Sequence, residues 1–173
     1  MQVEIYSTPD NSQDQIDMME KFIERKVDLI VVSPNESEAL RPVIEKAYDS
    51  GIPIILIDRK INSDKYTAFI GGDNTEVGRL AGKYIAELLN GKGRIIEIQG
   101  LKGSSSSQER HIGFHEVIDK YSDISVISTF HADWQEKKAE AIMDSIGDSI
   151  GDYDIVFSFN DRMAIGAKNS AIK

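Results

Sequence analysis

A regular alternation of short apolar runs with longer amphipathic segments is the feature that most constrains the fold. Residues 29–33, 54–57 and 155–159 are short runs dominated by isoleucine, valine, leucine and phenylalanine. Runs of this kind are typical of strands that are buried on both faces. The segments between them repeat apolar residues every three or four positions, which indicates helices. Alternating strands and helices predict an α/β fold with parallel sheets and helices on both faces.

The predicted elements follow one another along the whole chain. We expect strands at residues 3–7, 29–33, 54–57, 66–70, 94–99, 126–130 and 155–159. We expect a turn over residues 8–12 that ends in a helix N-cap, a polar loop over residues 100–107, and helices at about residues 12–26, 37–49, 75–89, 108–121, 135–149 and 160–167. Gly51 is predicted to end the second helix as its C′ residue. Gly78 and Gly82 are predicted to allow close packing of the third helix.

The strands and helices form two series that meet near residues 71–74. We therefore expect two doubly wound α/β lobes, the first over residues 1–72 and the second over residues 73–173. Domains usually run to about 100–150 residues, so a chain of 173 residues is long enough for one good core or two small ones.

Composition excludes several classes of function. The net charge of −9 disfavours nucleic acid as a partner, because non-specific DNA affinity comes mainly from neutralised phosphates. The absence of cysteine removes disulfides, thiolate metal sites and a cysteine nucleophile. No apolar run approaches the roughly 20 residues that span a bilayer. The first residues also lack the charge and apolar pattern of a signal peptide.

No catalytic or cofactor motif is apparent. The chain has no P-loop, no Gly-x-Gly-x-x-Gly and no Gly-x-Ser-x-Gly, and no nucleophile stands near a base in sequence. His111 and His115 stand at positions i and i+4 of a predicted helix, a spacing that can chelate a metal. Since no glutamate directly follows His111, we interpret them as a surface pair. We predict no metal, no cofactor and no catalytic residue.

Polar and aromatic side chains gather where the predicted strands end. In open parallel sheets, ligands bind beyond the carboxyl ends of the strands. Carboxylate, guanidinium and amide groups suit sugar hydroxyls, and an indole offers a flat face to C–H groups. The candidate ligand-binding residues are Ser33, Asp58, Arg59, Arg110, Trp134 and Asn160.

Each candidate also has a structural interpretation. Asp58 and Arg59 could be a helix cap and a solvated side chain. Arg110 could be a solvated helix residue, and Trp134 could be half-buried packing. Asp161 could be a helix N-cap or a ligand group.

Taken together, several segments resemble the ribose-binding branch of the type I periplasmic binding proteins, whose architecture also serves the effector domains of LacI-type repressors and the sensors of some hybrid histidine kinases. The resemblance covers nearly the whole chain. It rests on residues 33–37 (SPNES), 52–59 (IPIILIDR), 72–74 (GDN), 108–114 (QERHIGF) and 160–167 (NDRMAIGA).

The resemblance implies a receptor that closes two lobes around a monosaccharide. It implies sugar contacts from Asp58 and Arg59 in the first lobe and from Arg110 and Asn160 in the second, with Trp134 stacking on the ring. Ser33 stands where ribose binders carry asparagine, which argues against ribose itself. The hinge crossing would be Gly71, Gly72, Asp73 and Asn74.

The resemblance also implies partners and a location. The partners would be a sugar and a permease, kinase or DNA-binding module outside this segment, with a homodimer possible. An extracytoplasmic location is favoured, and a cytoplasmic one would follow if the parent were a LacI-type regulator.

Relative to the family, the chain looks truncated at both ends. It lacks the first strand, which in the family lies between the strands that here contain Ile5 and Ile30, and it lacks the later strands of the second lobe. We therefore expect a longer parent protein, or a first sheet repaired by rearrangement or by a second chain.

Three alternatives remain open from the sequence. One is the effector-binding domain of a LacI-type regulator. Another is a doubly wound sugar-phosphate or nucleotide enzyme with Asp58 as its base. The third is a regulatory module that binds only protein partners.

Overall fold

The chain folds into two compact α/β units. The computed structural model describes residues 2–7 and 11–171. One unit extends to Gly72 and includes Gly103–Ser105, and the other comprises Asp73–Lys102 and the chain from Ser106 onward. The division along the chain falls at residues 72–73, inside the segment that the sequence singles out as a hinge.

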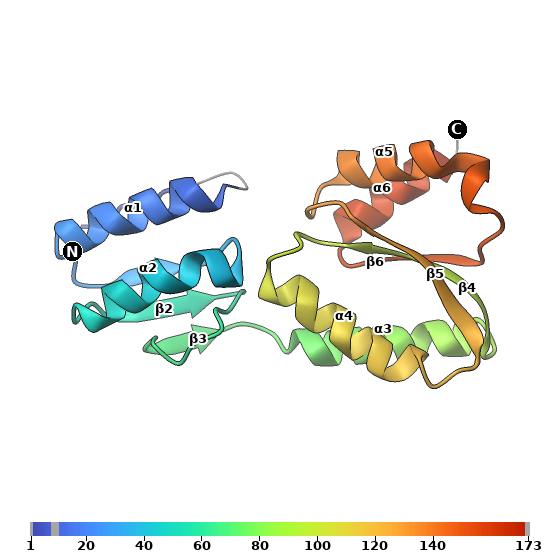
Figure 1. The fold of residues 1–173 in the computed structure, drawn as a ribbon, viewed down its shortest axis with the longest axis horizontal. Helices are drawn as coiled ribbons and strands as arrows, with labels where there is room; N and C mark the ends of the chain where they lie inside the picture. The colour runs from blue at the N-terminus through green and yellow to red at the C-terminus, as the bar shows by residue number, and fades with distance from the viewer. Residues whose placement is uncertain (1, 8–10, 172–173) are drawn as a thin grey trace. The chain divides into compact units, whose positions relative to one another are not determined.

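The first unit is a small parallel sheet with two helices. Its elements are α1 (Ser12–Glu24), β1 (Ile30–Val32), α2 (Ser37–Asp49), β2 (Ile54–Ile57) and β3 (Ala68–Ile70), and the strand order is β1-β2-β3 (Figure 1). Ile30 pairs with Ile54, and Leu56 pairs with Phe69. The glycine expected to end α2 does so: Gly51 follows the C-cap with a φ of +84°, a backbone angle that glycine adopts without steric cost.

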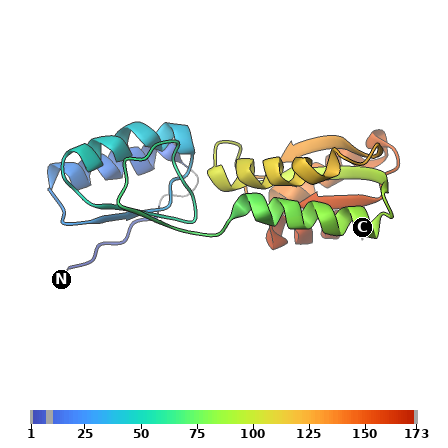
Figure 2. The same cartoon turned by 90° about the horizontal axis from the view of Figure 1, so that it is seen from below.

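The core of the first unit lies between the strands and both helices. Met19 of α1 and Leu40 and Ile44 of α2 pack with Ile54 and Leu56 of β2, all of them buried. Because side chains alternate across a strand, the neighbouring positions face the other way. Val31, Ile57 and Ile70 are accordingly exposed. In this unit both described helices thus cover the same face of the sheet (Figures 1 and 2).

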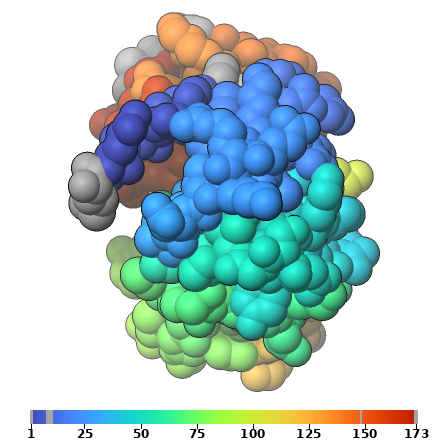
Figure 3. Space-filling view, turned by 90° about the vertical axis from the view of Figure 1, so that its left-hand side faces the viewer, coloured from blue at the N-terminus to red at the C-terminus, as the bar shows by residue number. Residues whose placement is uncertain are grey.

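The predicted first strand is not formed. Residues 2–7, in the dark blue segment of Figure 3, adopt no regular structure. The side chain of Ile5 is 89% exposed. A strand needs a neighbour that accepts and donates backbone hydrogen bonds. Instead, residues 2–7 touch α1 through side chains: Glu4 pairs with Arg25, and Tyr6 meets Phe22 edge to face.

The first helix begins close to its expected start. Asn11 is the N-cap of α1, and its side-chain oxygen accepts from the backbone N–H groups of Gln13 and Asp14. Asparagine is among the favoured residues at this position. Residues 8–10 of the predicted turn lie outside the described residues.

The second unit is a parallel sheet with helices on both faces, as predicted. Its elements are α3 (Asn74–Leu88), β4 (Lys92–Gln99), α4 (Ser105–Ile118), β5 (Asp123–His131), α5 (Glu136–Ile146), the 3-10 helix η1 (Gly147–Ile150), β6 (Ile155–Ser158) and α6 (Asp161–Ala171). The strand order is β5-β4-β6. Strand β4 is therefore central, and the α3–α4 pair and the α5–α6 pair flank it (Figures 1 and 2).

Alternation along β4 divides the second unit into two cores. Ile95 packs with Phe114 and the rest of the α3–α4 pair, whereas Ile96 and Ile98 pack with the α5–α6 pair. The α3–α4 contact is close at glycine, as expected: a Cβ on Gly78 would lie 2.2 Å from the carbonyl oxygen of Arg110.

One helix boundary differs from its expected place at the serine-rich segment. Helix α4 begins at Ser105, so residues 105–107 belong to a helix and not to the predicted polar loop. All three serines are buried. Polarity alone therefore misplaced them, because short polar side chains are also favoured in the first turn of a helix. Within the described ranges, none of the helices is long and apolar enough to cross a bilayer.

Candidate functional site

In the first unit, the predicted site residues lie at the carboxyl edge of the sheet. Ser33 directly follows β1, and Asp58 and Arg59 directly follow β2. Arg59 donates to the backbone oxygen of Asn35 at 3.2 Å. The amide of Gln15 donates to the Ser33 carbonyl and accepts from the Asn35 N–H, both at 2.8 Å, and so fixes this turn.

Asp58 is held in an unusual backbone conformation. Its φ is +63°, in the left-handed region that few non-glycine residues occupy, although aspartate tolerates it better than most. The Asp58 N–H donates to the Ile70 carbonyl at 2.9 Å, which anchors the turn to β3. Its side chain is 68% exposed, and that of Arg59 is 19% exposed. The carboxylate is thus presented to solvent, while Arg59 lies against Asn35.

In the second unit, three predicted residues come together from α4 and from the segments that follow β5 and β6. Arg110 of α4 lies over the ring of Trp134, with 5.5 Å from guanidinium carbon to ring centroid. Asn160, which precedes α6, donates to the Trp134 carbonyl at 3.3 Å. Arg110 also donates to the Phe159 carbonyl. The structure therefore gathers Arg110, Trp134 and Asn160 at the carboxyl edge of the second sheet.

Asn160 also has a structural role that the sequence left open. Its side-chain oxygen accepts from the N–H of Met163 at 2.8 Å, which caps the first turn of α6. The N-cap considered for Asp161 therefore belongs to Asn160, and Asp161 is the exposed first residue of the helix. Only the amide nitrogen of Asn160 is turned toward Trp134.

The predicted hinge residues separate into two kinds. Gly71 and Gly72 follow β3 without regular structure, whereas Asp73 caps α3 by accepting from the N–H of Glu76 at 2.9 Å. Asn74 is the buried first residue of α3, and its oxygen accepts from Nε of Arg110 at 3.0 Å. Asn74 thus orients Arg110, a role that sequence reasoning did not assign to it.

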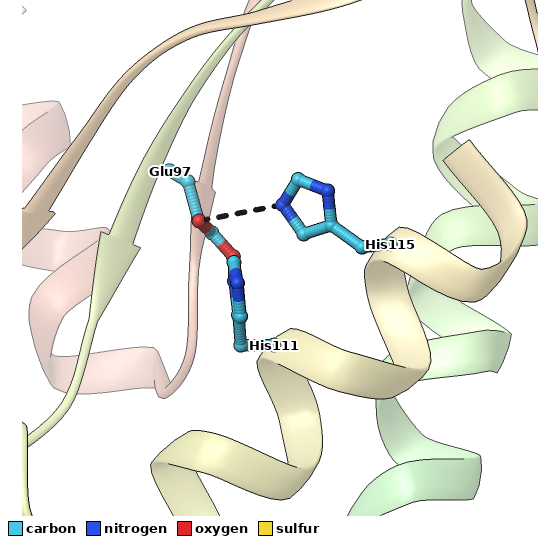
Figure 4. A group of neighbouring side chains, drawn as sticks. All are labelled: Glu97, His111 and His115. Carbon is cyan, nitrogen blue, oxygen red and sulfur yellow. Dashed lines mark hydrogen bonds and ion pairs between the residues drawn. The ribbon is translucent and has the colours of Figure 1, made fainter. Parts of the chain in front are cut away.

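A second polar group lies away from these residues, beneath α4. Glu97 is fully buried in the middle of β4, where alternation turns it to the same side as Ile95. His111 and His115 face it from successive turns of α4 (Figure 4). The two histidines are thus partly exposed, as expected of a surface pair, but both rings also face a buried carboxylate that the sequence analysis did not assign to them. A lone glutamate within an isoleucine strand was the signal that sequence reasoning missed.

Although the Glu97 carboxylate is buried, both of its oxygens make polar contacts. Oε1 lies 3.0 Å from Nδ1 of His111, while Oε2 accepts from the hydroxyl of Thr129 at 3.1 Å and from the amide of Gln99 at 2.9 Å. Burial alone would raise the pKa of Glu97, but the imidazoles of His115 and His111 and the Gln99 amide outweigh burial and hold this pKa below its usual value.

The pKa of His115 shifts in the opposite direction. Glu97 raises it most, burial opposes this, and a hydrogen bond at 2.9 Å between the His115 ring and Asp119 raises it further. The cluster therefore concentrates negative charge around His115. Glu97, His111 and His115 are the described residues whose donor atoms are close enough together to hold a metal ion.

Parallel α/β units with polar side chains at the carboxyl edges of their sheets are typical of ligand-binding α/β proteins. The model of one such family, the periplasmic binding protein domain, matches residues 1–173. The chain belongs to this family.

Named relatives show the same likeness. The chain is 30% identical over 167 residues to the ribose import binding protein of Bacillus subtilis (strain 168), covering 96% of this chain and 54% of the relative. It is 32% identical over 165 residues to a galactofuranose-binding protein of Escherichia coli (strain K12), covering 90% of this chain and 51% of the relative.

Solved structures agree. A fructose binding periplasmic domain of a hybrid two component system superposes with a TM-score of 0.95 at 46% identity, covering 99% of this chain and 57% of that one. A galactofuranose binding protein superposes with a TM-score of 0.91 at 29% identity, covering 98% and 60%. The chain thus spans about half the length of the relatives it matches.

Proposed function

We propose that this chain is the ligand-sensing part of a sugar receptor and has no catalytic role. The observation that carries the proposal is that Arg110, Trp134 and Asn160 meet at the carboxyl edge of the second sheet, where guanidinium and amide groups lie beside an indole ring. Those groups suit the hydroxyls and C–H faces of a monosaccharide. Asp58 and Arg59 would complete the site from the first unit, with Ser33 beside them.

The proposed mechanism is closure of two lobes around the sugar. Residues 1–72 and 73–173 would be the lobes, and residues 71–74 would be one crossing of the hinge. A sugar that binds the closed form more tightly than the open form shifts the population toward closure by its difference in affinity. Closure would then be the signal that a partner reads.

A signalling parent is favoured over a transporter. The likeness to the periplasmic domain of a hybrid two component system is 46% identity, against 30% for the ribose import protein. We therefore propose an extracytoplasmic sensor whose output module lies outside this segment, with a permease as the alternative partner.

The test is calorimetric titration of the full-length parent protein with D-ribose and D-fructose, wild type beside Asp58→Ala. Loss of a charged acceptor from sugar hydroxyls is expected to cost about 2 kcal/mol, or roughly thirtyfold in affinity. The matched control is Asp64→Ala, an exposed aspartate of the same unit that should bind as the wild type does.

Several outcomes would contradict the proposal. Unchanged affinity in Asp58→Ala removes this residue from the site. Absence of saturable binding of any monosaccharide to the full-length parent protein in a broader thermal-shift screen contradicts sugar sensing altogether. Turnover of the sugar or its phosphate would instead support a doubly wound enzyme.

A further inference from the structure

The cluster beneath α4 plays no part in the proposed sugar site. In this cluster Glu97 comes from β4, and His111 and His115 come from α4, one helical turn apart (Figure 4). One donor atom from each of the three residues lies within 4.8 Å of the other two. Two imidazoles at i and i+4 with a carboxylate opposite are a frequent three-residue ligand set for zinc.

The distances suit a metal of zinc's size. Nδ1 of His111 is 3.0 Å from Oε1 of Glu97, and Nε2 of His115 is 3.8 Å from Oε2. Ligand atoms around a tetrahedral ion with bonds of about 2.0–2.1 Å are about 3.3 Å apart. Small rotations of the side chains would therefore bring the three donors to bonding positions, and a fourth position would remain for water.

One donor atom in the cluster has no hydrogen bond. Nε2 of His115 is shielded from solvent, and in the part of the chain that the structure describes no hydrogen bond reaches it. Its 3.8 Å separation from Glu97 is longer than a hydrogen bond. The other ring nitrogen contacts the Asp119 carboxylate at 2.9 Å, so in the neutral ring that a metal requires the proton would lie there and the lone pair of Nε2 would be available to a cation.

The surroundings orient the donors as metal sites require. A metal-binding histidine usually donates its second ring N–H to a carboxylate, and Asp119 does this for His115. Thr129 and Gln99 donate to Oε2 of Glu97, and the Gln99 amide nitrogen also lies 2.8 Å from Nδ1 of His111, so zinc would have to displace that contact. The His111 side chain is 40% exposed, which leaves an entry path from solvent.

We propose that Glu97, His111 and His115 bind one divalent transition-metal ion, with Zn²⁺ the best match. Imidazole nitrogen favours zinc and its neighbours over Mg²⁺ and Ca²⁺, which prefer all-oxygen sites. The ion would tie α4 to β4 and thereby hold Arg110, which directly precedes His111, in its place. The inference stands independently of the proposed sugar binding.

The test is a titration of tag-free, chelator-treated chain with Zn²⁺ at neutral pH, followed by calorimetry. One equivalent is expected to bind, and Co²⁺ at the same site is expected to give a visible d–d absorption band. His115→Asn is expected to weaken binding at least tenfold. His131→Asn is the matched control and should bind as the wild type does, because His131 lies outside the cluster.

Asp119→Asn tests the same site without removing a ligand. This substitution is expected to weaken zinc binding about tenfold or more, which is the usual effect of losing a carboxylate that is hydrogen-bonded to a ligating histidine. Equal affinity in His115→Asn and the wild type, or absence of one-to-one binding to the wild type, would overturn the proposal.

A measurement on the wild type alone guards against variants that fail to fold. Ring-nitrogen NMR signals of His111 and His115 should shift on addition of Zn²⁺, while those of His131 should not. Mg²⁺ and Ca²⁺ at equal concentration should leave all three unchanged. A zinc response confined to His131, or the same response to Mg²⁺, would also contradict the assignment.

Discussion

Gly100 lies directly under the indole of Trp134. A Cβ built on Gly100 would stand 2.2 Å from both Cε2 and Cζ2 of that ring, far inside van der Waals contact. Trp134 cannot relax freely, because its backbone has a φ of +65° and Arg110 lies over its ring. The missing side chain of one residue thus sets the position of the ring proposed to stack on the sugar.

We therefore expect Gly100→Ala to displace the indole. Overpacking usually costs about 1–3 kcal/mol of unfolding free energy, and sugar affinity should fall with it. Trp134 is the only tryptophan, so tryptophan fluorescence, excited where tyrosine does not absorb, reports on this ring alone. Gly72→Ala is the control for stability, because a Cβ there meets nothing within 4 Å. Unchanged emission and stability in Gly100→Ala would show that the contact is not made.

The close approach of α3 to α4 gives a prediction about Gly78. Helix propensity alone predicts that Gly78→Ala stabilises the protein by about 1 kcal/mol. Packing predicts the opposite sign, since a Cβ would lie 2.2 Å from the Arg110 carbonyl oxygen and 2.8 Å from the Phe114 nitrogen, both backbone atoms. We expect a net loss of about 1–3 kcal/mol, measured as a lower urea midpoint at constant m. A raised midpoint would mean that the helices are not packed at this distance.

The two roles of Asn160 can be separated by substitution. Asn160→Ala removes the N-cap of α6 and should cost about 1 kcal/mol of stability. Asn160→Ser keeps a capping oxygen and should restore most of that loss. If the amide nitrogen also binds the ligand, sugar affinity should fall in both variants, as titration calorimetry would show. Full affinity in Asn160→Ser would confine this residue to capping.

The contact of residues 2–7 with α1 predicts that the pKa of Glu4 is lowered. Hydrogen bonds from Arg25 and Tyr6 lower the pKa of Glu4 to about 2 from an ordinary value of 4.5. A lowered pKa means that the ion pair contributes stability above about pH 4.5, and that this contribution is lost as the pH falls toward 2. NMR titration of the Glu4 side chain measures the shift directly.

Removing the partner tests the cause of that shift. Arg25→Gln should return the pKa of Glu4 most of the way to its ordinary value. Arg41→Gln is the control, because Arg41 pairs with Glu38 instead. An ordinary Glu4 pKa in the wild type would show that residues 2–7 do not rest on α1.

Much of this protein could be predicted from local patterns. Apolar runs and helical spacing gave the parallel α/β fold, and the rule that polar residues end buried strands placed Asp58, Arg110 and Asn160 at sheet edges. These predictions succeed because periodicity and strand polarity are local properties of the chain.

The tertiary structure decided what depends on distant partners. Residues 3–7 have a strand-like sequence, yet a strand exists only where another backbone pairs with it. The sequence predicts only that His111 and His115 form a surface pair. The structure shows that β4 places Glu97 beneath both rings. The sequence by itself determined most of the helices and strands and which strand ends are polar. Only the packing of β4 against α4 brought together three donor groups, because the contact of residues far apart in the chain is set by how whole elements pack.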